Sequence, residues 1–383
     1  MNNDFSHEFN LDDDIIYLNH AAVAPWPVRT EQAVNDFCRE NVTIGSKKYA
    51  HWLRVESHLK EQLATLLNAQ SVDEIALVKN TSEALSFVAY GIGWAAGDNI
   101  VTSDEEFPSN MIPWESLVEQ NISVKKISLK NCADPTDALI QNIDDNTRLL
   151  TISSVQYASG LQVDLERLGR VCEEKNVLFC IDAIQSIGAF PVDVQRYKAD
   201  FMMADGHKWM LGPEGLGVFY CRQQALDKLE LTQYGWHMVE DMGNYDNPIW
   251  ETASSARRFE CGSPNMLSIH ALSASLSLLL EIGMQTVSKN VIERGQYCVD
   301  KIQQNSAFKL LTNPNKNGNN IIVFKLKNGD TNALFEYLTA NNVVCAKRGG
   351  GIRFSPHFYT PYEVIDKSFT LIDRFLEDNS NVN

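Results

Sequence analysis

The sequence has no CxxC pair among its eight cysteines, no internal repeat and no low-complexity tract. Cysteines spread in this way argue against a disulfide framework or a zinc site, so we expect no metal, and a reducing cytoplasm fits best. The longest apolar stretch, around 271–282, is too short and too rich in serine to span a membrane. The N-terminal residues 1–14 are acidic and polar, unlike a signal peptide. We therefore expect a cytoplasmic protein with no membrane partner.

The chain also has few basic residues, with 33 lysines and arginines against 49 aspartates and glutamates and a formal net charge of −16. Such a surface repels a polyanion, so we expect no nucleic-acid partner. A small anionic ligand is still compatible, because it needs only a local group of donors. Hydrophobic residues make up 44% of the 383 residues, and a chain of this length exceeds the usual size of one core. Two domains are therefore expected.

Short apolar runs alternate with amphipathic runs along the first 220 residues. This alternation predicts βαβ units, and therefore an α/β fold with a mostly parallel sheet. The expected strands are 75–78, 99–103, 123–127, 149–155, 177–181, 201–204 and 217–220. The expected helices between them are 82–91, 110–120 and 164–174.

The pattern changes after these strands. Residues 233–265 are rich in Gly, Asn, Pro and aromatics and predict a long irregular connection, which in compact domains is usually functional. Beyond a helix over 268–282, a smaller α/β unit is expected, with helices over 287–305, 331–340 and 361–378 and strands over 320–325, 343–346 and 351–354. We therefore expect an N-terminal arm over 1–20 near the domain junction, a large domain over 21–255 and a small domain over 256–383.

The first candidate for chemistry is Lys208, in the segment Ala-Asp-Gly-His-Lys-Trp-Met-Leu-Gly at 204–212. An apolar strand precedes it and a glycine-rich turn follows, so Lys208 is expected at a strand end, where α/β sheets bind ligands. Desolvation there lowers the pKa of an amine and makes it a nucleophile that forms an imine with an aldehyde. Taken alone, a lysine beside glycines is more often a solvated surface residue.

The second candidate is Asp182, which ends the apolar run Val-Leu-Phe-Cys-Ile at 177–181. An ionised carboxylate there needs a cationic or hydrogen-bonding partner. A pyridinium nitrogen is one such partner, and keeping it protonated makes the ring an electron sink. The alternative is an aspartate that caps a helix after the strand.

The third candidate is the pair Thr81 and Ser82, which follow a strand and precede a helix. Hydroxyls and free backbone amides at a helix N-terminus form an anion site suited to phosphate. Plain helix capping is the alternative, and the commoner outcome for such a segment.

Together these segments resemble fold-type I enzymes that use pyridoxal 5′-phosphate (PLP), specifically the class V aminotransferase family, which includes cysteine desulfurases and kynureninases. The resemblance runs from about Tyr17 to Phe375, and its most specific elements are Asp-x-x-Gln at 182–185 and Gly-His-Lys at 206–208. It implies a large domain with a mostly parallel seven-stranded sheet flanked by helices, and a smaller C-terminal α/β domain. It also implies PLP as the cofactor.

The resemblance implies roles for the matching residues. Lys208 would hold the cofactor as a Schiff base and carry protons. Asp182 would pair with the pyridine nitrogen, and Gln185 would bond the O3′ oxygen of the ring. Three other residues would hold the phosphate, namely His207, Thr81 and Ser82.

Three further segments are similar to the family. Phe107 stands where a family residue stacks on the pyridine ring, a position at which desulfurases carry a histidine. A stacked phenylalanine gives dispersion but no proton chemistry. The alternative is that Phe107 is a simple core aromatic. Ser154 stands at a strand end that touches O3′ and the substrate, where desulfurases often carry asparagine. Ser263 lies in a segment that reaches the partner's phosphate, which implies a homodimer with a two-fold interface.

Two residues are expected to meet the substrate. Arg353, in Gly-Ile-Arg-Phe-Ser, resembles the family's carboxylate-binding arginine, and a guanidinium grips a carboxylate in a bidentate fork. A surface arginine on a strand is the alternative. His20, in Tyr-Leu-Asn-His-Ala-Ala, is expected to line the site, with a satisfied structural histidine as an equal alternative.

The sequence departs from the desulfurase pattern at two points. Asp205 stands where desulfurases usually place a serine that bonds the phosphate, and an aspartate should repel a phosphate dianion unless it points away or pairs with a cation. The loop that carries the desulfurase cysteine is missing, and Cys345 lies in a strand-like run that leads directly to Arg353. Nothing around Cys345 suggests the exposed, electropositive setting that a thiolate needs.

We therefore expect a PLP-dependent enzyme acting on a small α-amino acid, as a transaminase or a C–S-lyase-like enzyme. A cysteine desulfurase, a selenocysteine lyase and an amino-acid epimerase are the alternatives. A PLP-binding protein without turnover is an alternative of another class, against which the intact Lys208, Asp182, Gln185 and Arg353 argue. A nucleotide-binding α/β protein is disfavoured because the glycines at 91–97 follow a helix rather than a strand.

Overall fold

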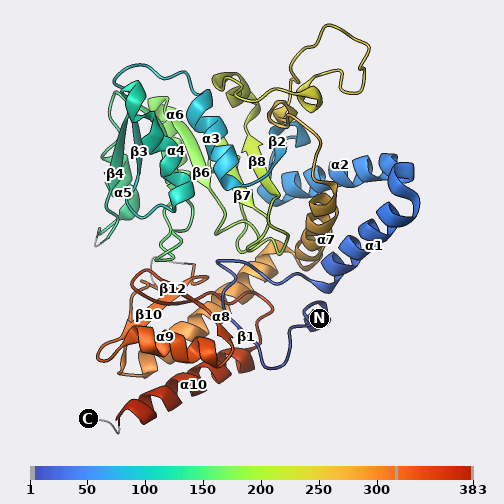
Figure 1. Cartoon of the computed structure of the whole chain (residues 1–383). Coiled ribbons are helices and arrows are strands. Elements are labelled where there is room, and N and C mark those ends of the chain that lie inside the picture. Colours follow the sequence, from blue (N-terminus) through green and yellow to red (C-terminus); the bar gives the residue numbers. More distant parts are fainter. Residues whose placement is uncertain (1–4, 131, 315–317, 381–383) are drawn as a thin grey trace.

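The computed structural model describes residues 5–130, 132–314 and 318–380. Figure 1 shows two bodies, a larger one built on a twisted sheet and a smaller one formed by the orange and red C-terminal elements. The N-terminal segment runs between them. This layout matches the α/β fold that the sequence predicts.

The large body is built on a seven-stranded sheet with the strand order β2-β8-β7-β6-β5-β3-β4. Neighbouring strands are parallel, except that β8 runs antiparallel to both β2 and β7. The strands are β2 (Ile75–Val78), β3 (Asn99–Ser103), β4 (Ser123–Ile127), β5 (Thr147–Ser153), β6 (Leu178–Asp182), β7 (Phe201–Asp205) and β8 (Gly217–Cys221). The predicted mostly parallel seven-stranded sheet is confirmed.

Both faces of this sheet are covered over its inner strands, which is why β6 and β8 are continuous apolar runs, whereas the edge strand β4 carries two lysines. Successive side chains of β2 go to opposite cores: Leu77 joins the core that contains residues of α2, α6 and α7, and Ala76 joins the core beneath α3. β7 alternates in the same way, with Met202 on the first side and Phe201 on the second. The sheet is therefore the middle layer of a three-layer body.

Within the described part of the chain, seven α-helices accompany this sheet, and Figure 1 shows α1, α2 and α7 side by side. They are α1 (Val28–Ile44), α2 (Tyr49–Leu67), α3 (Thr81–Gly91), α4 (Ile112–Glu115), α5 (Pro135–Ile140), α6 (Leu165–Lys175) and α7 (Met266–Ile282). Short 3₁₀ turns complete this body: η2 (Gly45–Lys48), η3 (Val72–Glu74), η4 (Pro108–Asn110), η5 (Ser116–Gln120), η6 (Gln223–Lys228), η7 (Trp236–Met238) and η8 (Ala256–Phe259).

The smaller body contains a four-stranded antiparallel sheet with the order β12-β13-β10-β9, packed against helices. Its elements are α8 (Met284–Gln304), β9 (Phe308–Leu310), β10 (Ile322–Leu326), α9 (Thr331–Ala340), β12 (Ala346–Arg348), β13 (Gly351–Phe354) and α10 (Tyr362–Ser380). The N-terminal segment holds η1 (Ser6–Glu8) and β1 (Ile16–Tyr17), and β1 pairs in parallel with β11 (Val343–Val344). This pairing ties the N-terminal arm to the smaller body.

Helix α7 bears on the predicted domain boundary. The sequence placed residues 256–383 in the small domain, but α7 packs on α1 and α2 and contributes Leu272 and Leu276 to the core of the larger body. It meets α8 at a bend of 86° next to Gly283. A boundary at this bend accounts for the packing better than one at residue 255, and the division itself stays a prediction.

The predicted helix over 110–120 is wrong as one element. It is divided into η4, α4 and η5, and Pro113 lies inside the run. Proline lacks the N–H that a continuous helix needs, so one regular helix cannot pass through it undisturbed. The predicted irregular stretch 233–265 is confirmed, with only η7 and η8 as short turns within it.

No individual helix among the described residues has the length and apolar character to cross a bilayer. Helices α7 and α8 meet those criteria only when they are joined across their bend.

Candidate functional site

A cavity of about 240 Å³ lies where β5, β6 and β7 end. Their last residues, Ser153, Asp182 and Asp205, all line it. Parallel strands present their carboxyl ends at one edge, and the chain reverses there in loops that carry functional side chains. The remaining lining residues are Ala21, Ala22, Thr81, Phe107, Ser109, Val155, Tyr157, Ile184, Gln185, His207, Lys208, Arg348 and Arg353.

Lys208 lies in the turn that follows β7, half-buried, as the sequence predicts. Its Nζ is 5.7 Å from the centroid of the Phe107 ring. Burial lowers the pKa of Lys208 to about 8; Asp182 opposes this shift and Arg353 adds to it. About a tenth of the amine is therefore neutral at pH 7, far more than for an ordinary lysine. The side chain has the character of a nucleophilic amine and not of a solvated surface lysine.

Asp182 is 2% exposed, and burial raises the pKa of its carboxyl to about 6, while a hydrogen bond from the Ile184 N–H (3.0 Å) and the charge of Lys208 lower it. Residues 184–186 form a turn, so the helix-cap alternative does not describe this aspartate. The next motif residue, Gln185, donates from Nε2 to the Ala21 carbonyl (3.0 Å) and accepts from Trp209 Nε1 (2.9 Å). These contacts hold the amide at the cavity wall with one N–H still free to donate.

Thr81 is the first residue of α3 and lines the cavity, but it is not the helix cap. The cap is Asn80, whose side chain accepts from the Glu83 N–H at 2.9 Å. The Thr81 N–H instead donates to Asp205 Oδ1 at 2.7 Å. Ser82 does not line the cavity, and its hydroxyl donates to Ser109 Oγ at 2.8 Å. Only Thr81 of the predicted pair therefore faces the site directly.

Arg353 is 3% exposed on β13, so the surface-strand alternative is wrong. Its Nη1 donates to the Tyr157 carbonyl at 2.8 Å, and its Nε makes no hydrogen bond within the described residues. Burial lowers the pKa of its guanidinium to about 10, and Arg348 adds to this shift. A buried cation with a free donor on the cavity wall is suited to hold an anion.

Two predicted site residues lie elsewhere. Ser154 does not line this cavity: its hydroxyl contacts Ser186 Oγ (2.8 Å), and Ser153, one residue earlier, faces the cavity in its place. His20 is fully buried, with Nδ1 bonded to the Ser355 carbonyl and Nε2 to the Tyr359 hydroxyl, both at 2.8 Å. Because both ring nitrogens are occupied, His20 has the structural role that the sequence left open as its alternative.

Ser263 lines a second cavity of about 490 Å³, together with Lys79 and Glu83. That Ser263 reaches the phosphate of a partner subunit in a homodimer stays a prediction.

Glu106 supports the site without lining the cavity, and the sequence did not single it out although it directly precedes Phe107. It is 7% exposed beneath Ser153, and it accepts from the Ser153 N–H (2.9 Å), Asn110 Nδ2 (2.7 Å) and Gln156 Nε2 (2.5 Å). Burial raises the pKa of its carboxyl to about 7, against the lowering by these donors. Glu106 holds the end of β5 in place from behind.

No cysteine of the described chain lines the cavity. Cys345 lies between β11 and β12, half-buried, and burial raises the pKa of its thiol to about 12. Such a thiol stays protonated near neutral pH and is a poor nucleophile.

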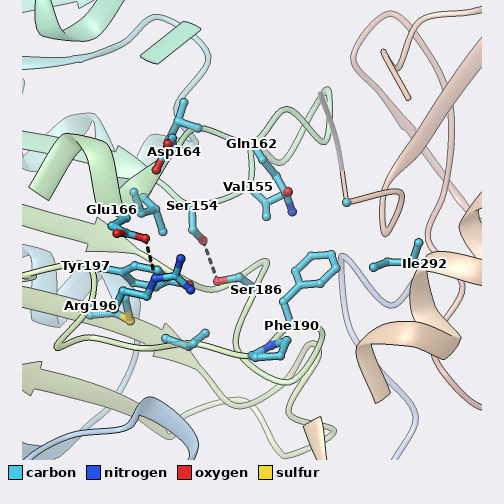
Figure 2. A pocket seen from close by; sticks show the side chains of 16 residues that line it. Ser154, Val155, Gln162, Asp164, Glu166, Ser186, Phe190, Arg196, Tyr197 and Ile292 are labelled. Carbon is cyan, nitrogen blue, oxygen red and sulfur yellow. Dashed lines mark hydrogen bonds and ion pairs between the residues drawn. The ribbon is translucent and has the colours of Figure 1, made fainter. Parts of the chain in front are cut away.

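A larger cavity of about 380 Å³ lies near the same strands (Figure 2). Its walls carry the Ser154–Ser186 hydrogen bond and the ion pair between Arg196 and Glu166 (2.5 Å). In both pairs the groups satisfy each other, and no lysine is among the lining residues described. Its greater volume therefore does not make it the better candidate for chemistry.

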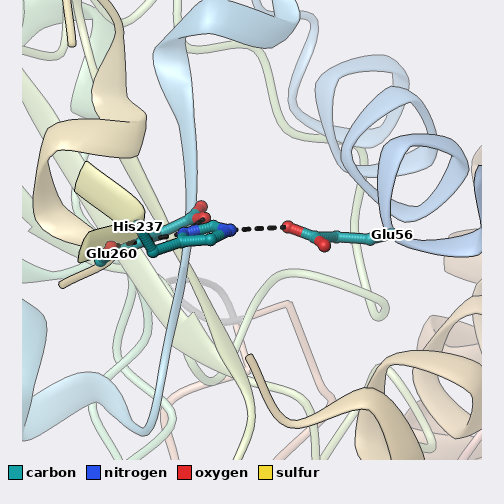
Figure 3. A group of neighbouring side chains, drawn as sticks. All are labelled: Glu56, His237 and Glu260. Carbon is teal, nitrogen blue, oxygen red and sulfur yellow. Dashed lines mark hydrogen bonds and ion pairs between the residues drawn. The ribbon is translucent and has the colours of Figure 1, made fainter. Parts of the chain in front are cut away.

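A buried group of three side chains, Glu56, His237 and Glu260, has the composition of a metal site (Figure 3). The ring of His237 lies between the carboxylates, with Nδ1 3.5 Å from Glu260 and Nε2 4.0 Å from Glu56. Lys60 Nζ lies 2.7 Å from Glu260 and already supplies a compensating positive charge. The group therefore serves to join α2 to the irregular segment 233–265.

The cavity can be tested for its fit to PLP by its unsatisfied atoms. Nδ1 of His207 and Nε of Arg353 are buried and make no hydrogen bond to any described residue. Buried polar atoms without partners are costly, and an anionic ligand would satisfy the N–H of Arg353. Lys208 supplies an amine for an aldehyde, and Asp182 a buried carboxylate for a ring nitrogen. This donor set fits PLP, with the Asp205 carboxylate as its one discordant member.

Comparison with known proteins agrees with this geometry. The sequence pattern of the aminotransferase class-V family matches residues 16–361. A probable cysteine desulfurase of Methanothermobacter thermautotrophicus is 29% identical over 374 residues, covering 92% of each chain.

Two solved structures share the fold. The cysteine desulfurase CsdA of Escherichia coli has a TM-score of 0.86 and 23% identity, covering 97% of this chain and 98% of CsdA. The cystine C–S lyase C-DES, solved with its product cysteine persulfide, has a TM-score of 0.87 and 21% identity, covering 94% of this chain and 98% of C-DES. A variant of C-DES was solved with glycine covalently linked to PLP. From residue 16 to residue 361, this chain belongs to the class-V aminotransferase family of PLP-dependent enzymes.

Proposed function

We propose that this enzyme cleaves the C–S bond of a cysteine-type α-amino acid. The observation that carries the proposal is the convergence of Lys208, Asp182 and Arg353 on one cavity. Relatives named cysteine desulfurase and the cystine lyase C-DES favour sulfur chemistry over transamination, the other activity that the sequence predicts.

The chain's own residues supply binding and proton transfer. Bound PLP supplies an electron sink for the charge that develops at the substrate Cα. Arg353 would hold the substrate carboxylate with its free Nε and a second N–H, which orients the Cα–H bond. The Lys208 amine would accept the Cα proton, and its pKa of about 8 suits a base near neutral pH. Asp182 would hold a proton on the ring nitrogen through its buried negative charge.

The fate of the sulfur depends on whether a thiol of the enzyme takes part. Because no described cysteine lines the cavity and the Cys345 thiol is protonated, we propose elimination: the Cβ–S bond breaks, the sulfur leaves with its electron pair, and the amino-acid fragment hydrolyses to pyruvate and ammonia. Desulfuration through an enzyme persulfide, with alanine as product, is the second candidate, and the names of the relatives favour it.

The test is product analysis with cysteine and cystine as separate substrates. Pyruvate and ammonia are expected in equal amounts. Cys345→Ser should retain activity within about twofold, as should the matched control Cys38→Ser, which changes an exposed thiol. Alanine together with a large loss in Cys345→Ser would refute elimination in favour of the persulfide route. A keto acid that retains the sulfur would refute C–S cleavage altogether.

A further inference from the structure

Asp205 occupies an unusual position for a carboxylate. It is the last residue of β7, and its Oδ1 accepts the N–H of Thr81, the first residue of the eleven-residue helix α3, at 2.7 Å. The N-terminus of a helix is a natural phosphate site. In this chain a carboxylate already takes one of the N–H groups that a phosphate would use, beside the unsatisfied Nδ1 of His207.

The carboxylate is held there by packing. Asp205 pairs with Gly217 across β7 and β8, and a Cβ added at Gly217 would lie 3.1 Å from Asp205 Oδ1. The same Cβ would lie 2.6 Å from the Ala204 carbonyl oxygen, so glycine at 217 leaves room for both the strand backbone and the carboxylate. A side chain with β-strand on one side and a helix N-terminus on the other has little freedom to turn away when a ligand enters.

Among the described residues, cations compensate the charge of Asp205 only in part. The His207 Nδ1 is 3.5 Å from Oδ2, but burial lowers the pKa of His207 to about 4, so its ring is neutral near neutral pH. Lys208 attracts the charge of Asp205, whereas Glu214 and Asp182 repel it. No lysine or arginine in the described ranges forms an ion pair with Asp205. Burial consequently raises the pKa of Asp205 to about 6.

We propose that Asp205 binds the cofactor phosphate as a neutral carboxyl group, so that cofactor binding takes up one proton. The carboxyl O–H would donate to a phosphate oxygen, in the place of the serine hydroxyl usual in desulfurases. The proton comes from solvent and lies in the hydrogen bond between the Asp205 carboxyl and the phosphate, because a carboxylate and a phosphate in contact cannot both stay fully ionised. The inference rests on the cofactor of the family and is independent of the reaction that PLP supports.

The proposal sets the pH dependence of cofactor affinity. Because the pKa of Asp205 is about 6, the free-energy cost of protonating it weakens PLP binding about 100-fold at pH 8 and less than about twofold at pH 5.5. Asp205→Asn keeps the shape and an acceptor for the Thr81 N–H without a charge, and should therefore bind PLP about 100-fold more tightly than the unmodified chain at pH 8. The advantage should shrink toward none at pH 5.5.

The experiment is an absorbance titration of the apoproteins with PLP between pH 5.5 and 8.5. The titration of PLP itself is common to all the proteins, so it cancels in the ratio of dissociation constants. Asp205 raises the pKa of Lys208, so that pKa is measured in each protein and its contribution is removed from the ratio. Asp205→Ser should behave like Asp205→Asn. Glu214→Gln is the matched control, because it removes one exposed carboxylate of the same neighbourhood and should change affinity less than about twofold at every pH.

A second measurement guards against a variant that fails to fold. Calorimetric titration of the unmodified apoprotein at pH 7.5, in buffers of different ionisation enthalpy, should show about one more proton taken up than for Asp205→Asn. A ratio of dissociation constants that does not change with pH, equal proton uptake, or weaker binding by Asp205→Asn at pH 8 would overturn the proposal. Failure of PLP to bind any of the proteins would refute it too, whereas unexpected reaction products would bear only on the proposed reaction.

Discussion

Replacing Arg353 by lysine should separate recognition of the substrate carboxylate from the rest of catalysis. Arg353 is 3% exposed and lines the cavity; its Nη1 donates to the Tyr157 carbonyl, and its buried Nε makes no hydrogen bond within the described residues. A guanidinium holds a carboxylate through two parallel N–H bonds, whereas an ammonium acts as a point charge on a flexible stem. Lysine would therefore keep the charge and lose one directed bond.

The size of the effect follows from that bond. A hydrogen bond to a charged group contributes about 1.5–3 kcal/mol. Its loss should lower kcat/KM for cysteine about 10- to 150-fold in Arg353→Lys. Arg353→Leu, which loses both bonds, should fall roughly 10²- to 10⁴-fold. Since Arg353 is a buried cation without a carboxylate partner among the described residues, the leucine variant should lose little thermal stability.

The assay compares cysteine with cysteamine, which differs from cysteine only by lacking the carboxylate. With cysteine the unmodified enzyme should exceed Arg353→Lys in kcat/KM, as worked out above. With cysteamine, which offers no carboxylate to Arg353, the two proteins should have nearly equal kcat/KM. Arg348→Lys is the control, since Arg348 lines the same cavity but is exposed and bonds the Lys347 carbonyl. Equal losses with both substrates, or no loss with cysteine, would refute the carboxylate role.

Two further predictions concern pH. Burial lowers the pKa of Lys208 to about 8, so borohydride trapping of PLP on the apoprotein should rise about tenfold per pH unit below pH 8 and level off above it. Asp182→Asn should move this midpoint to lower pH, and a higher midpoint would contradict the pairing of the two groups. Burial lowers the pKa of His20 to about 4, below its unfolded value of about 6.5, so the unfolded chain binds more protons and stability is lost as pH falls from 6.5 toward 4. Urea unfolding at pH 7 and pH 4.5 gives the loss in free energy of unfolding between these two pH values, and this loss should be smaller by about 2–3 kcal/mol in His20→Asn. An equal loss in both proteins would disprove the role of His20.

Local pattern was sufficient for most of the large sheet. The strands over 75–78, 99–103 and 123–127 have the predicted bounds, because each is a short run that contains β-branched residues and lies between turn signals. Helix α1 was missed because Thr30 is its one fully buried residue, so it lacks a readable apolar stripe. Helix α2 buries Trp52, Leu59, Leu63 and Leu66 at helical spacing, which is a pattern typical of an amphipathic helix.

The choice between Ser153 and Ser154 depended on the tertiary structure. Two consecutive serines at a strand end point to opposite faces of the sheet, and only the register with β6, in which Ser153 pairs with Asp182, shows which one faces the cavity. His20 and Arg353 were undecided for a similar reason. Their partners, the Ser355 and Tyr157 carbonyls, lie 335 and 196 residues away in the chain.

The sequence by itself determined the fold class, the family and the placing of Lys208 and Asp182 at strand ends, because each of these depends on the order and spacing of neighbouring residues. Only the tertiary structure decided which groups share the cavity, which are buried and how their pKa values shift. Desolvation and charge act between residues that are distant in sequence, as they do between Asp205 and the first turn of α3.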